Sequence, residues 1–286
     1  MKVEWTTKSK EMDALLAMDD LEILELGSGM EATVYKVSST MMNRSYALKL
    51  WNKRLPTDVE RQYHVLLQLL EAGMSVSKPY GWGRNLNGEY ILLTSYDGEP
   101  LPFNSVHSSH MKVIAHQLVK IHSLRLSYLE EYLPQYDDIM GYFFPRNEVH
   151  SDILELLQKI LEDINVRTNC LIHGDYNLGN ILIDQGRFTI IDWTNAQQGD
   201  SRYDFAWASF LIKIYNGEKC YAEFVKTYIE RIPTDDKDVY LFEILACLRW
   251  IWLSRIAPIP LHKDTLHRVK KFIEDHRELE DIVLKM

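Results

Sequence analysis

Cysteine is scarce in this chain of 286 residues, and no stretch is apolar for long enough to cross a membrane. The three cysteines, Cys170, Cys220 and Cys247, are odd in number and far apart, so they indicate neither a disulfide framework nor a CxxC metal site. A membrane-spanning helix needs about 18 apolar residues in succession, and the first residues lack the apolar segment of a secretory signal. We therefore expect a cytoplasmic protein with reduced thiols and no membrane partner.

Glycine and proline are also infrequent, at 13 and 9 residues, which excludes a collagen-like or low-complexity chain. Basic residues are also fewer than acidic ones. The chain has 32 Lys and Arg and 41 Asp and Glu, which gives a net charge of −9 and a pI of about 5.6. This balance argues against nucleic acid as a partner. The deficit is uneven: residues 1–96 hold 11 basic against 12 acidic side chains, whereas residues 97–286 hold 21 against 29.

The first hundred residues have the pattern of a β-rich lobe. Runs rich in β-branched, aromatic and other apolar residues predict strands at residues 21–26, 33–37, 46–51 and 90–94. Between them, apolar residues recur at helical spacing over residues 58–72, and Gly73 ends that segment like a C-cap. A turn at residues 97–100 closes this part of the chain.

Beyond this turn the apolar periodicity becomes that of long helices. It predicts helices at residues 111–124 and 151–164, and further helices from residue 204 almost to the C-terminus. The exception is a pair of apolar strands around Gly186, which predicts a hairpin with glycine in a left-handed turn position. We expect an α+β fold of two lobes, a small β-rich lobe of residues 1–96 and a larger, mainly helical lobe of residues 97–286.

The segment HGDYNLGN at residues 173–180 has the densest pattern of chemically active side chains. Asp175 precedes Asn180 by five residues, and Asp192 follows the predicted hairpin at the end of a strand. Phosphoryl transfer needs a carboxylate to take a proton and oxygen ligands to hold Mg²⁺ against phosphates. The spacing of Asp175 and Asn180, with His173 before them, is that of a kinase catalytic loop. The alternative is that Asp175 and Asn180 only satisfy the backbone of a turn.

Gly27, Ser28 and Gly29 form a short glycine-rich segment between two predicted strands. Glycines in such a turn let backbone N–H groups approach phosphate oxygens closely. The segment is not a Walker A loop, because no GKS or GKT follows, and it is not a dinucleotide fingerprint, because a strand and not a helix comes next. Ala32 stands where a third glycine would complete the pattern of a kinase glycine loop.

Lys49 lies in the strand segment YALK, between Leu48 and Leu50. An inward lysine with apolar neighbours is costly without an anionic partner. Glu60, in the first turn of the next helix, is the expected counterion, and with it Lys49 would face the α- and β-phosphates of ATP. Glu71 and Glu31 are the competing candidates.

The sequences HGDYNLGNILID and IIDWTNAQQGDSRYDFA resemble those of the aminoglycoside phosphotransferase and choline kinase group of small-molecule kinases. The resemblance spans about residues 20–255, and it is most specific over residues 172–206. It implies the two-lobed, protein-kinase-like fold. It also implies that ATP binds the N-terminal lobe and that the C-terminal lobe carries catalysis and the acceptor.

The resemblance further implies roles for single residues. Asp175 would be the catalytic base, and Asn180 and Asp192 would be the Mg²⁺ ligands. In the nucleotide site, the glycine segment, Lys49 with Glu60, and the hinge around Thr94 and Tyr96 would hold ATP. Asp204 would be structural and bind the catalytic loop from the start of a helix.

The acceptor is expected to be a small molecule. Only 11 residues separate Asp192 from Asp204, which leaves no room for the long activation segment of a protein kinase. The acidic C-terminal lobe favours a cationic acceptor such as an aminoglycoside. The candidate acidic lining residues are Asp137, Asp138, Asp200, Glu218, Asp235, Asp236, Asp238 and Glu243.

Aromatic residues offer a second interpretation of the acceptor. Tyr203, Trp207, Trp250 and Trp252 include candidates for a cation–π cage around a choline-like ammonium, although core packing is an alternative for most of them. The sequence thus predicts an ATP- and Mg²⁺-dependent kinase of a hydroxyl group, with an aminoglycoside as the first candidate and choline, ethanolamine or another metabolite as the next. A catalytically silent, nucleotide-binding relative is the alternative of another class. The pattern leaves the oligomeric state open.

Overall fold

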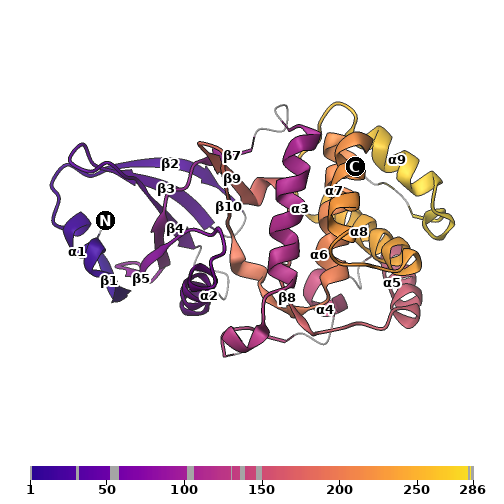
Figure 1. The fold of residues 1–286 in the computed structure, drawn as a ribbon, viewed down its shortest axis with the longest axis horizontal. Coiled ribbons are helices and arrows are strands. Elements are labelled where there is room, and N and C mark those ends of the chain that lie inside the picture. The colour runs from indigo at the N-terminus through magenta and orange to yellow at the C-terminus, as the bar shows by residue number, and fades with distance from the viewer. Residues whose placement is uncertain are drawn as a thin grey trace. The chain divides into compact units, whose positions relative to one another are not determined.

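The computed structural model describes residues 2–29, 32–51, 58–101, 106–129, 131–135, 139–145, 150–282 and 284. The chain forms two compact units (Figure 1). The first unit consists of Met1–Glu99 and Leu182–Thr194, and the second of Pro100–Ile181 and Asn195–Met286. The first unit is therefore built from two separate stretches of sequence. The predicted division of function between residues 1–96 and 97–286 stays a prediction.

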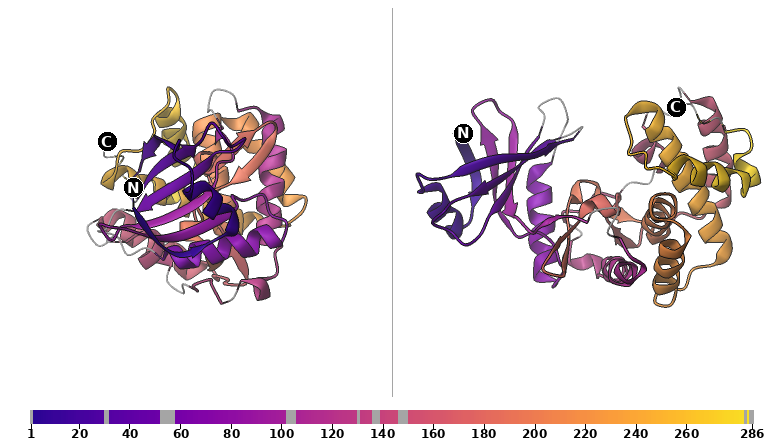
Figure 2. Two further views of the ribbon diagram at one scale, coloured as in Figure 1. Left: turned by 90° about the vertical axis from the view of Figure 1, so that its left-hand side faces the viewer. Right: turned by 90° about the horizontal axis from the view of Figure 1, so that it is seen from above.

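The first unit contains a six-stranded sheet (Figure 2, left). Its strands are β1 (Val3–Lys8), β2 (Glu22–Ser28), β3 (Ala32–Ser38), β4 (Tyr46–Trp51), β5 (Pro79–Asn85) and β6 (Tyr90–Ser95). They are ordered β1-β5-β6-β4-β3-β2, and every neighbouring pair is antiparallel. Helix α1 (Lys10–Leu16) follows the edge strand β1.

Strand β4 lies inside this sheet and places Lys49. Side chains alternate between the faces of a strand, so Tyr46 and Leu48 enter a core shared with Met12 of α1. Lys49 points to the opposite face, where its side chain is 20 % exposed. On the ladder it stands beside Val34 of β3 and Leu92 of β6.

Helix α2 (Val59–Glu71) packs against strands β5 and β6. Asp58 caps its N-terminus, because the carboxylate accepts the backbone N–H of Arg61 at 2.8 Å. The residues buried on this helix are Val59, Gln62, Tyr63, Val65, Leu66 and Leu69. Val59, Tyr63 and Leu66 are buried as the helical spacing predicts, whereas Leu67 and Leu70, which belong to the same pattern, are half-buried.

A hairpin of β9 (Ile181–Asp184) and β10 (Arg187–Ile190) forms most of the second stretch of the first unit. Its turn residues Gln185 and Gly186 have φ angles of 47° and 82°. Two successive positive φ values are the signature of a type I′ turn, which matches the twist of antiparallel strands. The predicted hairpin, with glycine in the left-handed position, is confirmed. Strand β7 (Glu99–Pro100) pairs with β9.

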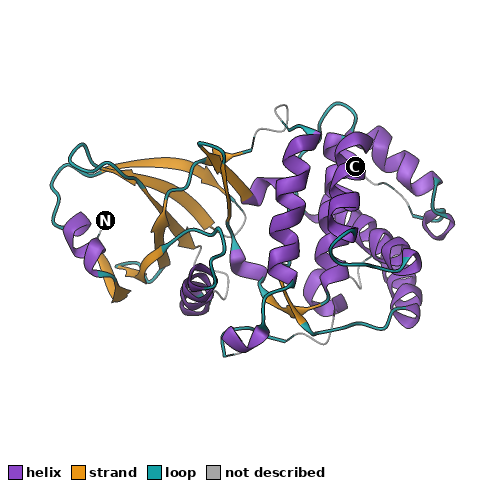
Figure 3. Cartoon of the chain, viewed as in Figure 1, coloured by secondary structure: helices purple, strands orange, loops and turns teal. Residues whose placement is uncertain are grey.

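The second unit is mainly helical (Figure 3). Its helices are α3 (Ser108–His122), α4 (Ile139–Phe143), α5 (Ser151–Asp163), α6 (Ser201–Asn216), α7 (Glu218–Ile229), α8 (Asp236–Ile256) and α9 (Thr265–Glu274). Helix α6 packs against α7, α8 and α9, and α3 packs against α7. Every residue of α8 from Leu241 to Trp252 is buried, as expected for a helix that is covered on all sides.

Two short strands in the second unit, β8 (Cys170–Ile172) and β11 (Gln197–Gly199), form an antiparallel pair. The α+β architecture with a β-rich N-terminal lobe is thus confirmed. The pattern did not predict β1, α1, β5 or the β8–β11 pair. Within the described residues, no helix combines the length and the apolar character required to span a membrane.

Candidate active site

The loop after β8 is held by a buried carboxylate. Asp204, in the first turn of α6, is fully buried and accepts the backbone N–H groups of His173 at 2.5 Å and Gly174 at 2.8 Å. Gly174 has a φ of 78°, and a Cβ there would lie 2.5 Å from the carbonyl oxygen of Asn195, so only glycine fits. The structural role expected for Asp204 agrees with these contacts.

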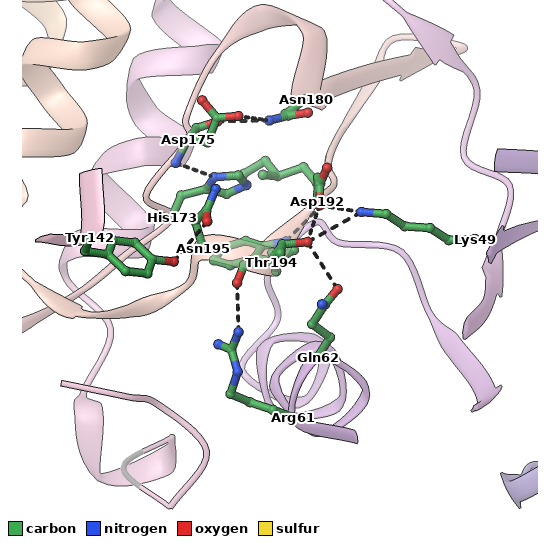
Figure 4. A network of polar contacts seen from close by, with 12 residues as sticks. Lys49, Arg61, Gln62, Tyr142, His173, Asp175, Asn180, Asp192, Thr194 and Asn195 are labelled. Atoms are coloured by element: carbon green, nitrogen blue, oxygen red, sulfur yellow. Dashed lines mark hydrogen bonds and ion pairs between the residues drawn. The ribbon is translucent and has the colours of Figure 1, made fainter. Parts of the chain in front are cut away.

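Asp175 directs its carboxylate to side chains and not to the turn backbone. Its Oδ1 accepts the indole N–H of Trp207 at 2.8 Å. Its Oδ2 accepts the amide of Asn180 at 3.2 Å (Figure 4). The turn itself is capped by Asn177, whose oxygen accepts the N–H of Gly179 at 2.8 Å. Asn177 therefore supplies the turn cap that was the alternative explanation for Asp175, whereas Asn180 also binds the turn backbone, as that alternative expects.

The amide of Asn180 is oriented by the loop. Its Nδ2 donates to the backbone oxygen of Asp175 at 2.9 Å and to the carboxylate at 3.2 Å. The amide oxygen is the remaining polar atom, and it is a hard oxygen ligand of the kind that Mg²⁺ prefers. In the described part of the chain, no three His, Cys, Asp or Glu side chains cluster as a metal site. Mg²⁺ in nucleotide sites is commonly held by one or two protein oxygens together with phosphates, and the donor set of Asn180 and Asp192 fits that chemistry.

In the first unit, Lys49 forms an ion pair with Asp192. Its Nζ lies 2.6 Å from Oδ1 of Asp192, and the hydroxyl of Thr194 donates to the same oxygen at 2.6 Å (Figure 4). Asp192 has a φ of 61°, in the left-handed region that few residues other than glycine enter. Backbone strain of this kind persists where the surroundings fix a functional side chain.

The predicted ion pair between Lys49 and Glu60 is not formed among the described residues. Glu60 is exposed on α2, whereas Gln62, two positions further and about 200° around the helix, is 3 % exposed on the buried face. The Gln62 amide lies 3.4 Å from the Thr194 hydroxyl (Figure 4). Helix α2 therefore contacts Thr194, two residues after Asp192, through the neutral amide of Gln62 and not through the carboxylate of Glu60. The sequence alone did not single out Gln62.

The backbone of that segment is also bound to α2. Nη2 of Arg61 donates to the carbonyl oxygen of Thr194 at 2.7 Å (Figure 4). Of the other candidate counterions, Glu71 is exposed at the far end of α2, and Glu31 lies outside the described residues.

The glycine segment ends β2 and begins the turn to β3. Gly27 and Ser28 belong to β2, and the N–H of Gly29 donates to the oxygen of Ala32 at 2.9 Å. The hydroxyls of Ser28 and Thr33 lie 3.1 Å apart across the hairpin. A Cβ at Gly27 would meet no atom within 4 Å, so nothing on this strand crowds the backbone there. Residues 30–31 lie outside the described residues.

The predicted hinge follows β6. Thr94 is within that strand, and the N–H of Tyr96 donates to the oxygen of Ser45 at 3.2 Å. Burial and a hydrogen bond to Glu99 raise the pKa of the Tyr96 hydroxyl to about 12. Because Ser45 already accepts the N–H of Tyr96, adenine would have to displace that bond to use this group.

The predicted aromatic cage contains a cation of the protein itself. The guanidinium of Arg249, from α8, lies 4.6 Å from the ring centre of Trp207, 5.4 Å from that of Tyr203 and 4.8 Å from that of Phe143. Arg249 is 8 % exposed, and burial lowers its pKa to about 10. Tyr203 and Trp207 therefore surround an arginine where an ammonium ligand was expected. Sequence reasoning missed Arg249, because nothing local marks it within an apolar helix.

The two other tryptophans have structural contacts. Trp250 donates its indole N–H to the hydroxyl of Tyr215 at 3.0 Å, and Trp252 packs against Phe144. Both are buried in the core of the second unit. Trp250 and Trp252 therefore have the core-packing role that was the alternative to a cation–π cage.

Four of the candidate acidic residues are engaged within the protein. Asp200 caps α6 and pairs with Arg202 at 2.6 Å, and Asp238 pairs with the same arginine at 2.7 Å. Asp235 caps α8, and Glu243 accepts the hydroxyl of Tyr221 at 2.8 Å. Burial raises the pKa of Glu243. Glu218 and Asp236 are exposed, while Asp137 and Asp138 lie outside the described residues.

Comparison with known proteins gives the following matches. The model of the phosphotransferase enzyme family (APH) matches residues 22–240. No curated protein matches the chain significantly. Among solved structures, an amicoumacin kinase in complex with AMP-PNP, Ca²⁺ and its ligand is 17 % identical, with a TM-score of 0.65 and 96 % of each chain covered.

Two further solved structures have similar scores. An aminoglycoside phosphotransferase in a ternary complex with AMP-PNP and hygromycin B is 16 % identical, with a TM-score of 0.61, covering 87 % of this chain and 92 % of that one. A Plasmodium vivax ethanolamine kinase is 17 % identical, with a TM-score of 0.63, covering 91 % and 84 %. At this identity the structural matches show a shared fold, which confirms the predicted kinase-like architecture. Because the family model matches most of its length, the chain belongs to the phosphotransferase enzyme family.

Proposed function

We propose that this enzyme uses ATP and Mg²⁺ to phosphorylate a hydroxyl group of a small, cationic molecule, with an aminoglycoside-type compound as the first candidate. The observation that carries the proposal is the environment of Asp175. Its carboxylate is partly buried and is held by the side chains of Asn180 and Trp207, while another residue caps the turn. A carboxylate fixed in this way is suited to take the proton of an acceptor hydroxyl.

Lys49 and the glycine segment are the proposed nucleotide contacts in the first unit. Lys49 projects from β4, and its ammonium group lies 2.6 Å from the carboxylate of Asp192. It can exchange this carboxylate for the α- and β-phosphates of ATP. Gly27, Ser28 and Gly29 would offer backbone N–H groups to phosphate, and Thr94 and Tyr96 would border the adenine. Glu60 is not proposed for this site, because it is exposed and Lys49 pairs elsewhere.

Asp192 and the amide oxygen of Asn180 are the proposed Mg²⁺ ligands. When bound, Mg²⁺ would offset the negative charge of the phosphates. Asp192 would then exchange Lys49 for the metal, while Thr194 and its contacts with α2 keep the carboxylate in place.

Support for a cationic acceptor comes from the net charge of residues 97–286 and from the fold shared with a hygromycin-binding phosphotransferase. The second candidate is an amino alcohol such as ethanolamine, favoured by the fold shared with an ethanolamine kinase. An ammonium acceptor would need a site other than the Tyr203–Trp207 cage, because Arg249 occupies that cage.

The experiment is an ATP-consumption screen over aminoglycosides, amicoumacin, choline, ethanolamine and homoserine, preceded by a thermal-shift titration with ATP and Mg²⁺. We expect turnover with at least one acceptor and a loss of roughly 10²- to 10⁴-fold in Asp175→Asn. Asp184→Asn, an exposed acid on the hairpin, is the matched control and should keep full turnover. Nucleotide binding without turnover on any acceptor would favour the silent relative, and no thermal shift with saturating ATP would refute both.

A further inference from the structure

Helix α6 reaches the loop of Asp175 at two points one helical turn apart. Asp204 binds the loop backbone, and Trp207, three residues on and on the same helix face, donates its indole N–H to Oδ1 of Asp175 at 2.8 Å. Trp207 is 3 % exposed, so the donor of this hydrogen bond is buried, while the Asp175 carboxylate is partly buried. Hydrogen bonds from a neutral donor to an ionised acceptor are stronger than neutral ones.

Arg249 contacts both the tryptophan and the loop. Its guanidinium lies 4.6 Å from the ring centre of Trp207, and its Nη1 donates to the carbonyl oxygen of Gly174 at 3.1 Å. Gly174 directly precedes Asp175. Arg249 therefore contacts both the backbone next to Asp175 and the tryptophan that donates to the Asp175 carboxylate.

The charge of Arg249 is costly in this position. Among the described residues no carboxylate lies within ion-pair distance of it, although the charge of Asp175 opposes the lowering of its pKa by burial, and its Nε is buried without a hydrogen-bond partner. A buried cation without a paired anion is strongly disfavoured unless aromatic rings and dipoles compensate it. A leucine or methionine would pack in the same helix at lower cost, so the arginine is better explained by its contacts with Trp207 and Gly174 than by packing.

We propose that Trp207 and Arg249 are positioning residues that fix the rotamer of Asp175. Trp207 occupies Oδ1 at 2.8 Å, while Asn180 reaches Oδ2 at the longer distance of 3.2 Å. Oδ2 is therefore the oxygen that takes the proton of the acceptor hydroxyl as the acceptor oxygen bonds to phosphorus and the bond to ADP breaks. This inference rests on the proposed role of Asp175 as the base.

The chain offers a matched control for the tryptophan. Trp250 is also a buried indole of the second unit, but its N–H donates to Tyr215, away from the loop. Trp207→Phe and Trp250→Phe each remove one indole N–H and keep an aromatic ring. Arg249→Lys keeps the charge and removes the planar guanidinium that stacks on Trp207 and reaches Gly174.

The first measurement follows the indole N–H signals of the 7 tryptophans by NMR in the full chain. The signal missing in Trp207→Phe identifies Trp207. We expect this signal to shift and its hydrogen exchange to become at least about ten-fold faster in Asp175→Ala and in Arg249→Lys. In Trp250→Phe it should not change. An unchanged Trp207 signal in Asp175→Ala or Arg249→Lys would overturn the proposal.

The second measurement is ATP turnover, with water as the acceptor and with each acceptor found active in the screen. We expect kcat to fall about 10- to 100-fold in Trp207→Phe, the range for losing one hydrogen bond to a charged group. The KM for ATP and the stoichiometry of AMP-PNP binding should stay within about two-fold of wild type, which separates positioning from loss of folded protein.

The two hypotheses fail in different ways. Equal turnover in Trp207→Phe and Trp250→Phe would overturn the positioning role even if Asp175→Asn is inactive. Full turnover in Asp175→Asn would overturn the proposed base, and the NMR signals would still decide whether Arg249 holds Trp207 on that carboxylate. If the wild type turns over no ATP, the NMR measurement decides alone.

Discussion

Replacing Asp204 by asparagine tests how the loop of Asp175 is held. Asn has the same shape, but one of its two acceptor oxygens becomes an NH₂ donor. In the native protein both oxygens accept backbone N–H groups, from His173 at 2.5 Å and Gly174 at 2.8 Å, and the residue is fully buried. One of these N–H groups would therefore face another donor with no water to replace the lost acceptor.

The size of the effect follows from two losses. A hydrogen bond to a charged group contributes about 1.5–3 kcal/mol, and leaving a buried donor unsatisfied costs about 1–3 kcal/mol. We expect Asp204→Asn to lower the free energy of unfolding by about 3–5 kcal/mol, a large part of the stability of a typical domain. With a slope of about 2 kcal/mol per M urea, the unfolding midpoint should fall by roughly 2 M.

The assay is urea unfolding followed by tryptophan fluorescence, together with hydrogen exchange of the His173 and Gly174 amides, which should both accelerate. Asp236→Asn is the control, because Asp236 is an exposed first-turn acid of α8 in the same unit. Its effect should be below about 0.5 kcal/mol. A loss of less than about 1 kcal/mol in Asp204→Asn, with unchanged amide exchange, would refute the reasoning that this carboxylate holds the loop.

Three further perturbations follow from the contacts described. Lys49→Met removes the cation 2.6 Å from Asp192, so affinity for AMP-PNP, measured by calorimetry, should fall at least about ten-fold; unchanged affinity would exclude Lys49 from the nucleotide site. Gln62→Glu places a second carboxylate on the buried face of α2 near Asp192 and should lower the melting temperature, whereas a higher melting temperature would mean that Lys49 pairs with the new acid. Burial raises the pKa of Glu243, so the folded state binds more protons than the unfolded state and stability falls as pH rises through the carboxyl range. Relative to wild type, Glu243→Gln should therefore become more stable as pH rises above about 4 in urea titrations, and a constant difference would contradict this.

The sequence was informative wherever a local pattern determines local structure. Turn chemistry around Gly186 predicted the hairpin, and helical spacing predicted α2, because these elements are decided by neighbours in sequence. The segment at residues 173–180 likewise carried its own pattern of Asp, Asn and Gly. These parts of the fold and of the candidate site needed no knowledge of distant contacts.

The partners of these residues were harder to predict. Lys49 was assigned Glu60 from proximity in sequence, but its described partner, Asp192, lies 143 residues away. Helix phase decided the outcome: α2 turns Glu60 to solvent and Gln62 inward. Arg249 was missed for a different reason, because only tertiary packing brings it onto Trp207.

Acidic composition was a weaker guide than it first seemed. The acid surplus of residues 97–286 suggested a lining for a cationic acceptor. In the structure, Asp200, Asp235, Asp238 and Glu243 instead cap helices, pair with arginine or bind a tyrosine. Composition gives the number of charged residues, but it does not show which of them are engaged in contacts within the protein.

The discontinuity of the first unit limits how such a protein can be rearranged by recombination. A single crossover after Glu99 would exchange the sheet but not Leu182–Thr194, which belongs to the same unit. The incoming sheet would meet a foreign partner at the contacts of Ser75 with Phe188 at 2.6 Å and with Ile190 at 2.8 Å, and at Lys49 with Asp192. Shuffled enzymes of this type should therefore require two matched segments to be inherited together, and a gene fragment ending at residue 99 would encode the six-stranded sheet without the stretch Leu182–Thr194 of the same unit.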